Sequence, residues 1–121
     1  MADTTPLTGA ALLVHFGLEA ESAYHLVTNE CDAPGSPARW HPVHPVHAAG
    51  SLHYAHRAAD AHGSTADMQA FGLFLLHDHT HQLAELIHNP GCSVKNGSVV
   101  PPSFWGSATW EAHRNHVHFA V

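Results

Sequence analysis

The chain has 121 residues, of which 45% are hydrophobic and 12% are charged, and this composition favours one packed globular domain over residues 1–121 and argues against disorder. The formal charge is −6 with neutral histidines and there is no run of lysine or arginine, which argues against binding to nucleic acid or to an anionic membrane. Fifteen histidines are the unusual feature, and because free imidazoles titrate near pH ~6.5, the net charge depends on pH.

The N-terminal part predicts a helix followed by a strand. Thr5 fits an N-cap, Pro6 the first helical position and Gly17 the C-terminal stop. The apolar run 10–16 is too short to span a membrane, and the start of the chain has no positively charged segment, so we expect neither membrane insertion nor a signal peptide. Residues 24–28 are rich in aromatic and β-branched side chains and predict a strand.

Residues 33–50 contain five Pro or Gly before Gly50 and predict an extended loop. Within it, the repeat His41-Pro-Val-His44-Pro-Val-His47 places an imidazole at every third residue, which polyproline II geometry aligns on one side. A metal-binding strip and a solvated loop both fit this pattern, and we expect the solvated loop. The two cysteines, Cys31 and Cys92, could pair or stay free.

Residues 65–88 have apolar side chains at helical spacing and predict one helix or two, with a joint near 77–80. Residues 94–102 predict a hairpin with Asn-Gly in its turn, and residues 116–121 predict a final strand. Phe104, Trp105 and Trp110 are expected in the intervening loop. The elements together predict an α+β fold, with helices packed on a small antiparallel sheet.

Two stretches far apart in the sequence carry residues that bind metals. His53 and Asp60 stand seven residues apart among small side chains, and the cluster 113–118 adds His113, His116 and His118. His116 and His118 would project to the same face of a strand. One carboxylate and two imidazoles match the ligand count of a catalytic zinc, which keeps one position for water.

The pattern Ser-x-His-x-x-x-Arg-Ala-x-Asp over residues 51–60, followed by His-Val-His at 116–118, resembles the zinc peptidoglycan peptidases. This group includes D-alanyl-D-alanine carboxypeptidases, phage endolysin L-alanyl-D-glutamate peptidases and the Hedgehog-type domain. The likeness covers roughly residues 47–121. It implies a Hedgehog/DD-peptidase-like fold in which the antiparallel sheet carries the zinc ligands, with His53, Asp60 and His118 as those ligands and Zn2+ as the cofactor.

The resemblance also suggests roles for neighbouring residues. Arg57 matches an arginine of the motif and would hold a substrate carboxylate or fix Asp60. Relatives have Gly where this chain has His56, and most have Asp or Glu as the general base where this chain has Asn115. An amide cannot accept the proton of a nucleophilic water. We therefore assign His116 as base or oxyanion stabiliser, with His113 as its partner or substitute.

The leading hypothesis is a monomeric zinc metallopeptidase that hydrolyses an amide bond of the peptidoglycan stem peptide or cross-link. Such a phage or bacterial lytic domain would reside in the virion or the host cytoplasm before release and act at the cell wall. One alternative is a non-catalytic zinc-containing module that binds cell-wall peptide. Another is a histidine-rich metal-binding protein. In the first two cases, His41, His44, His47, His77, His79 and His81 form no second catalytic centre and are mostly exposed.

Overall fold

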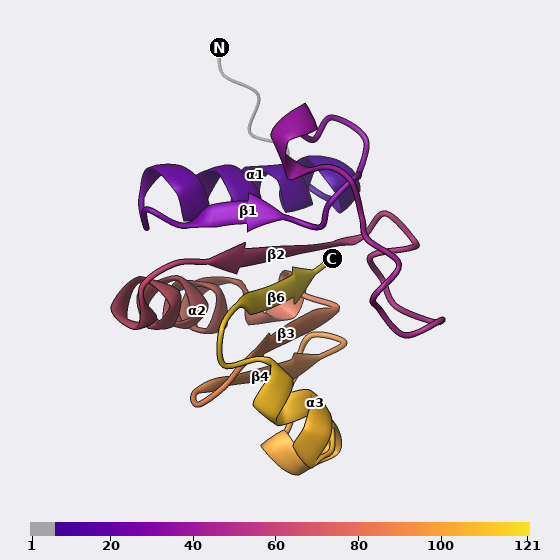
Figure 1. Cartoon of the computed structure of the whole chain (residues 1–121). Helices are drawn as coiled ribbons and strands as arrows, with labels where there is room; N and C mark the ends of the chain where they lie inside the picture. The colour runs from indigo at the N-terminus through magenta and orange to yellow at the C-terminus, as the bar shows by residue number, and fades with distance from the viewer. Residues whose placement is uncertain (1–6) are drawn as a thin grey trace.

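The computed structural model describes residues 7–121, and within this range the strands form one six-stranded antiparallel sheet. The strands are β1 (Val27–Asn29), β2 (Ala58–His62), β3 (Glu85–His88), β4 (Cys92–Lys95), β5 (Ser98–Val99) and β6 (Val117–Ala120). Their order in space is β1-β2-β6-β3-β4-β5, so β6 lies between β2 and β3 (Figure 1). The expected α+β class with a small antiparallel sheet is confirmed.

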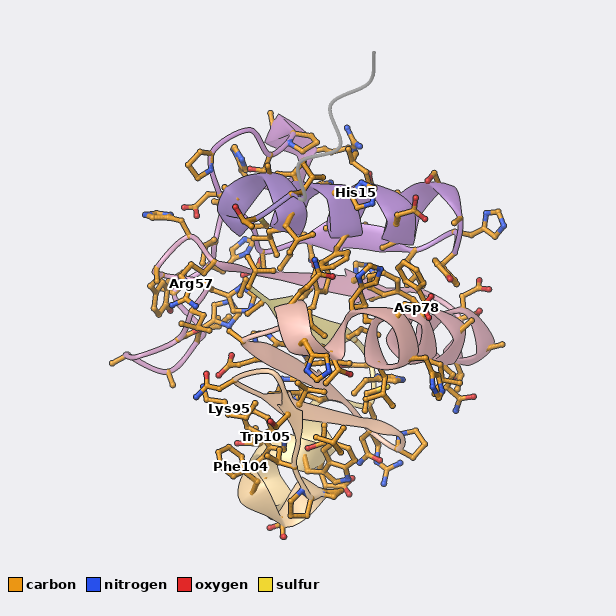
Figure 2. All side chains as sticks on the ribbon, turned by 180° about the vertical axis from the view of Figure 1, so that it is seen from behind. His15, Arg57, Asp78, Lys95, Phe104 and Trp105 are labelled. Atoms are coloured by element: carbon orange, nitrogen blue, oxygen red, sulfur yellow. The ribbon has the colours of Figure 1, made fainter. Side chains whose placement is uncertain are left out.

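Two long helices cover one face of this sheet. The helices are α1 (Gly9–Ser22), α2 (Thr65–His79) and the shorter α3 (Ser107–Ala112), with 3₁₀ turns at Ala38–Trp40, Thr80–Gln82 and Pro102–Phe104. α1 packs on β1 and β2, and α2 packs on β3 and β4; Figure 2 shows both in front of the sheet. Within residues 7–121, every helix is too short or too polar to cross a bilayer.

Alternation along the central strands separates the apolar core from the opposite face of the sheet. Ala59 and Ala61 of β2, and Val117 and Phe119 of β6, are fully buried in the core under α1 and α2. Successive side chains of a strand point to opposite faces, so the residues between them face away from the helices. The central strands β2 and β6 therefore carry Asp60 and His118 on the face that α1 and α2 leave open.

The expected helix end at Gly17 is wrong, because α1 continues to Ser22. Gly17 is buried inside the helix, and a Cβ at this position would lie 2.4 Å from Cη2 of the buried Trp40. The glycine therefore makes room for the indole ring, and it does not stop the helix. The expected N-terminal signals, Thr5 and Pro6, lie outside the described residues.

The expected second helix over residues 83–88 is also wrong, since β3 occupies residues 85–88. α2 itself begins as expected, with the Ser64 hydroxyl accepting the backbone N–H of Asp67, and ends at His79. A short apolar run fits helical and strand spacing equally well. Hydrogen bonding to two neighbouring strands makes this segment a strand, because β3 pairs with β4 on one side and with β6 on the other.

The later elements follow the sequence signals more closely. Asn96 and Gly97 both have positive φ, at 49° and 78°, and they join β4 to β5 in the expected hairpin. β6 forms where the final strand was expected. Trp110 is an exception, because it lies on α3 and not in a loop. Cys31 and Cys92 are buried free thiols.

Candidate metal centre

Three side chains expected to bind metal meet on the open face of the sheet. Nε2 of His53 lies 3.3 Å from Oδ1 of Asp60, and Nδ1 of His118 lies 3.1 Å from Nε2 of His53 and 3.4 Å from Oδ1 of Asp60. All three residues are buried, with 2%, 7% and 6% of their surface exposed. The structure thus brings together the three residues that the sequence singled out.

The sheet itself places two of the three. Asp60 of β2 and His118 of β6 are directly opposed partners in the antiparallel ladder, and their side chains share the face away from the core. His53 comes from the turn before β2, where the Ser51 hydroxyl accepts its backbone N–H at 3.2 Å.

Hydrogen bonds on the outer nitrogens fix which ring atoms face inward. Nδ1–H of His53 donates to the carbonyl oxygen of Glu30 at 2.7 Å, and Nε2–H of His118 donates to the Glu85 carboxylate at 2.8 Å. Such partners commonly orient histidines that bind metal. Two ring nitrogens and one carboxylate oxygen therefore face one another, and all three are acceptors unless a proton or a metal ion lies between them.

In the metal-free protein, a proton on His118 lies between these acceptors. Burial would lower the pKa of His118, but hydrogen bonds to Asp60 and Glu85 outweigh it and raise the pKa to about 9. Burial likewise opposes ionisation of the carboxylates, yet hydrogen bonds from His118 and His53 hold the pKa of Asp60 far below its usual range. Hydrogen bonds from His118 and Lys95 lower the pKa of Glu85 to about 2. The cluster is therefore built to hold a positive charge.

The spacing of the donors fits a metal of the size of zinc. Ligand bonds of about 2.05 Å to a tetrahedral ion imply donor–donor distances of about 3.3 Å. The three measured distances are 3.1, 3.3 and 3.4 Å. The donor set of two imidazoles and one carboxylate, at these distances, fits a tetrahedral ion with one position left.

A further donor, His47, was not assigned to this site from the sequence. One ligand atom each from His47, His53 and Asp60 lie within 4.8 Å of one another, an arrangement that could hold a metal ion. His47 is the last imidazole of the Pro/His repeat, which we expected to be solvated. The signal that could have found it is the repeat itself, but its spacing does not say which imidazole turns inward.

Glu30 connects this loop to the site. Its carboxylate accepts the backbone N–H of His44 at 2.9 Å, Nε2–H of His47 at 2.9 Å, and Nδ1–H of His44, while its carbonyl oxygen accepts Nδ1–H of His53. Glu30 has a φ of 56°, in the left-handed region that a non-glycine residue seldom adopts. Strain of this kind gathers at functional sites. The strained backbone thus places one residue in contact with three histidines.

His53, Asp60 and His118 lie in a cleft of about 630 Å³. Val46, Ala48 and Ser51 line one side, α3 contributes Ala108, Thr109 and Ala112, and Ile87, Trp105, Glu85 and Glu30 complete the lining together with the histidines. Histidines and carboxylates make up half of its lining residues, and small or apolar side chains make up the rest.

The two histidines assigned to catalysis, His113 and His116, also line this cleft. Their ring centroids are 4.7 Å apart, and that of His113 is 5.8 Å from His118. Nδ1–H of His113 donates to the carbonyl oxygen of Thr109 at 2.6 Å, and Nδ1–H of His116 donates to the Asn115 amide oxygen at 2.8 Å. Both Nε2 atoms therefore keep a lone pair.

Burial also keeps these two imidazoles neutral. It lowers the pKa of His113 to about 4 and shifts the pKa of His116 in the same direction. His88 supports the segment from behind, since its Nδ1–H donates to the carbonyl oxygens of His113 and His116 at 3.1 and 3.0 Å. Among residues 7–121, Nε2 of His88 is the one buried side-chain nitrogen or oxygen without a partner.

Arg57, assigned to substrate binding, lies outside the cleft lining. Its Nε–H donates to the backbone oxygen of Val121 at 2.7 Å, and Figure 2 shows it at the margin of the molecule. The structure gives it no contact with Asp60, so neither expected role has support. Asn115 is exposed and is likewise absent from the cleft lining.

The remaining histidines are mostly exposed, as expected. His41, His44, His77 and His81 are exposed, whereas His79 is half-buried and packs against Phe16 and Phe74. Within residues 7–121, the donors that could hold a common ion gather at one place, where His47, His53 and Asp60 form a group and His118 lies beside it. Comparison with protein-family models, with curated proteins and with solved structures finds no match for this chain.

Proposed function

We propose that the protein is a zinc-dependent peptidase that hydrolyses an amide bond in the stem peptide or cross-link of peptidoglycan. The observation that carries the proposal is the mutual approach of His53, Asp60 and His118 to 3.1–3.4 Å in an open cleft. Three protein donors with a fourth position accessible from solvent are the arrangement of catalytic zinc sites. Bound zinc would polarise the scissile carbonyl and lower the pKa of a water ligand toward ~7.

The backbone of the motif supports the resemblance to zinc peptidoglycan peptidases. His56 has a φ of 61°, in the left-handed region that favours glycine, and it stands where those peptidases have glycine. Its ring Nδ1–H donates to Asp32 at 2.6 Å, which helps the histidine to stay in this conformation. The turn between His53 and β2 thus keeps a shape that glycine would adopt without strain.

The catalytic residues of the proposal are His116 and His113. Both present an Nε2 lone pair while an oxygen holds their Nδ1–H, so either can accept a proton from a water attacking in the cleft. Carboxylates are less available for this role. Within the described chain, each carboxylate lining the cleft already accepts a hydrogen bond from a histidine, and these are Glu30, Asp60 and Glu85.

The lack of a free carboxylate base in the cleft favours one alternative, a non-catalytic module that binds cell-wall peptide through the metal. A site without a free carboxylate base can still hold zinc and a peptide carbonyl. The histidine-rich storage alternative has less support, because residues 7–121 bring together one group of donors and most other histidines are exposed and dispersed.

Digestion of purified peptidoglycan by the zinc-loaded protein tests the proposal, with the released fragments identified by mass spectrometry. New amino termini would identify the bond that is cut. His118→Ala should abolish the release, whereas His77→Ala, which removes an exposed imidazole of α2, should leave it unchanged. Zinc-dependent retention on peptidoglycan without any new terminus would instead support the binding module.

A further inference from the structure

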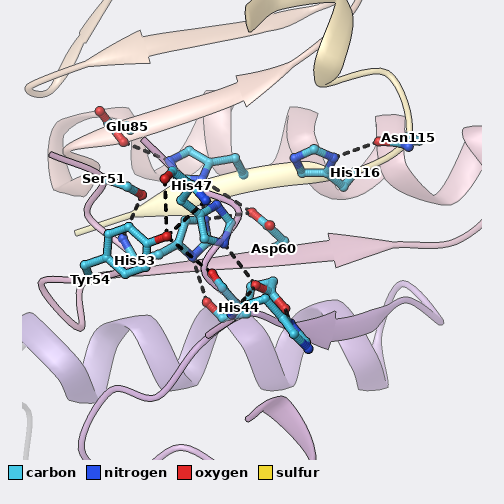
Figure 3. Close-up of polar contacts among 11 residues, drawn as sticks. His44, His47, Ser51, His53, Tyr54, Asp60, Glu85, Asn115 and His116 are labelled. Carbon is cyan, nitrogen blue, oxygen red and sulfur yellow. Dashed lines mark hydrogen bonds and ion pairs between the residues drawn. The ribbon is translucent and has the colours of Figure 1, made fainter. Parts of the chain in front are cut away.

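His47 approaches the metal donors from the loop that forms one wall of the cleft. Its ring stacks on that of His53 with centroids 4.0 Å apart and planes at 20° (Figure 3). One ligand atom of His47 lies within 4.8 Å of those of His53 and Asp60. In a tetrahedral site with bonds of about 2.05 Å, two donors lie about 3.3 Å apart. An inward shift of up to about 1.5 Å therefore makes His47 a ligand.

The hydrogen bonds of His47 match those of the other two imidazoles. Its Nε2–H donates to Oε1 of Glu30 at 2.9 Å, which leaves Nδ1 as the atom with a free lone pair. His53 and His118 likewise donate one ring N–H to an oxygen and turn the other nitrogen inward. This arrangement on all three rings is what metal-binding histidines require.

Only a few hydrogen bonds hold His47 and its loop in place, so the imidazole can move. Residues 41–50, all of them described, contain no helix or strand, and Val46 beside His47 is 77% exposed. The Tyr54 hydroxyl accepts the backbone N–H of His47 at 3.0 Å and donates to its carbonyl oxygen at 3.2 Å. Glu30 and Tyr54 therefore hold His47 through a few side-chain hydrogen bonds.

We propose that His47 is a fourth, displaceable ligand of the metal held by His53, Asp60 and His118. This inference rests on the proposed function and adds a form of regulation to it. With His47 bound, protein atoms fill all four positions of a tetrahedral zinc and no position remains for water, as in structural zinc sites. With His47 withdrawn, the site is open to water and peptide. The empty cleft thus holds the metal in a closed state.

The test follows the ring nitrogens of the histidines by ¹⁵N NMR while one equivalent of zinc is added to the full chain. Zinc should shift the ligating nitrogens of three rings, namely Nε2 of His53 and Nδ1 of both His118 and His47. His47→Gln should remove the third signal alone and lower the zinc affinity by about 10-fold or more. Acetohydroxamate, a small zinc-binding anion, should return Nδ1 of His47 to its metal-free position. Tyr54→Phe should make this displacement harder, because it removes the hydroxyl that holds His47 in its metal-free position.

Other results would overturn the inference. If zinc shifts His53 and His118 but leaves His47 unchanged in the wild type, His47 is not a ligand, and this result needs no variant that must fold. If His47 shifts and remains bound in excess acetohydroxamate, it is a fixed ligand and the displaceable role fails. The spectra require no turnover. If His47 behaves as expected while neither wild type nor His47→Gln cleaves peptidoglycan, the proposed peptidase function fails and the ligand assignment stands.

Discussion

Nδ1 of His118 lies 3.1 Å from Nε2 of His53, across 65 residues of sequence. The outer nitrogens of both rings already donate to oxygens, so the facing atoms would be two lone pairs in contact if both rings were neutral. The pair is stable only with a proton or a cation between the rings.

Zinc should bind with a stoichiometry of one per chain and stabilise the fold. At a free zinc concentration of 100 times the Kd, the gain in unfolding free energy is about 2.7 kcal/mol. Calorimetric titration measures the stoichiometry, and thermal unfolding with and without zinc measures the gain. Asp60→Asn should remove most of it. Several ions bound with equal affinity would instead point to a histidine-rich storage protein.

His116→Ala should lower the turnover of the zinc-loaded protein by about 10²- to 10⁴-fold, because it removes the assigned proton acceptor. Asn115→Ala should have a smaller effect, because it removes only the amide oxygen that accepts Nδ1–H of His116 and leaves the imidazole in place. Fragment release from peptidoglycan, divided by measured zinc content, gives the comparison. Near wild-type turnover in His116→Ala together with loss in Asn115→Ala would exchange the two roles.

The metal-free protein should lose stability on the alkaline side. Burial lowers the pKa of His118, but hydrogen bonds to Asp60 and Glu85 raise it to about 9, above the ordinary value of 6.5. The stabilisation is therefore fully present below pH about 6.5 and is lost as the pH rises through about 9. Denaturant unfolding from pH 6 to 10 in a chelator measures this loss of stability. The His118→Gln variant should not show the loss.

Zinc should reverse this dependence. Binding requires His118 without its proton, so zinc uptake at pH 7 should release a proton, and zinc-dependent stabilisation should weaken as the pH falls. Proton release measured in two buffers of different ionisation enthalpy during calorimetry would test this. Zinc uptake without proton release would mean that the metal binds elsewhere.

Gly17→Ala should destabilise the protein by about 1–3 kcal/mol, because the new Cβ would lie 2.4 Å from the buried ring of Trp40. Gly91→Ala is the matched control, since nothing lies within 4 Å of a Cβ there and its φ needs no glycine. It should change stability by less than about 0.5 kcal/mol. Chemical denaturation of both variants gives the comparison, and equal midpoints would contradict the packing role of Gly17.

His56→Gly should be more stable than His56→Ala by about 1 kcal/mol. Both variants lose the hydrogen bond to Asp32, so the difference isolates the cost of the left-handed backbone, with φ at 61°. Urea midpoints of the two variants measure it. An alanine variant as stable as the glycine variant would show that the turn can relax away from this conformation.

The sequence predicted the core of the candidate site better than it predicted the elements around it. His53, Asp60 and His118 were identified by motif resemblance together with strand alternation, and those signals survive errors of a few residues in the element boundaries. Residues 83–88 were misassigned to a helix, because a short apolar run has no period of its own. That error concealed Glu85, whose contact with His118 depends on β3 lying beside β6.

Other features depend on contacts that no local pattern encodes. Gly17 has the sequence appearance of a helix stop, yet the ring of Trp40, 23 residues later, determines its role. His47 belongs to a repeat of three equivalent imidazoles, and only the position of Glu30 selects it. Glu30 itself stands in no motif, and its left-handed backbone is visible only in three dimensions.

The position of β6 has a consequence for the order of folding. β6 is the last element of the described chain, yet it lies between β2 and β3 and bonds to both. Before it inserts, the β1–β2 and β3–β5 portions are two separate ribbons whose inner edges are unpaired. His118 belongs to this same strand, so insertion of β6 joins the two halves of the sheet and completes the metal donors in one step. Amide protection along β2 and β3 and competence to bind zinc should therefore develop together during refolding.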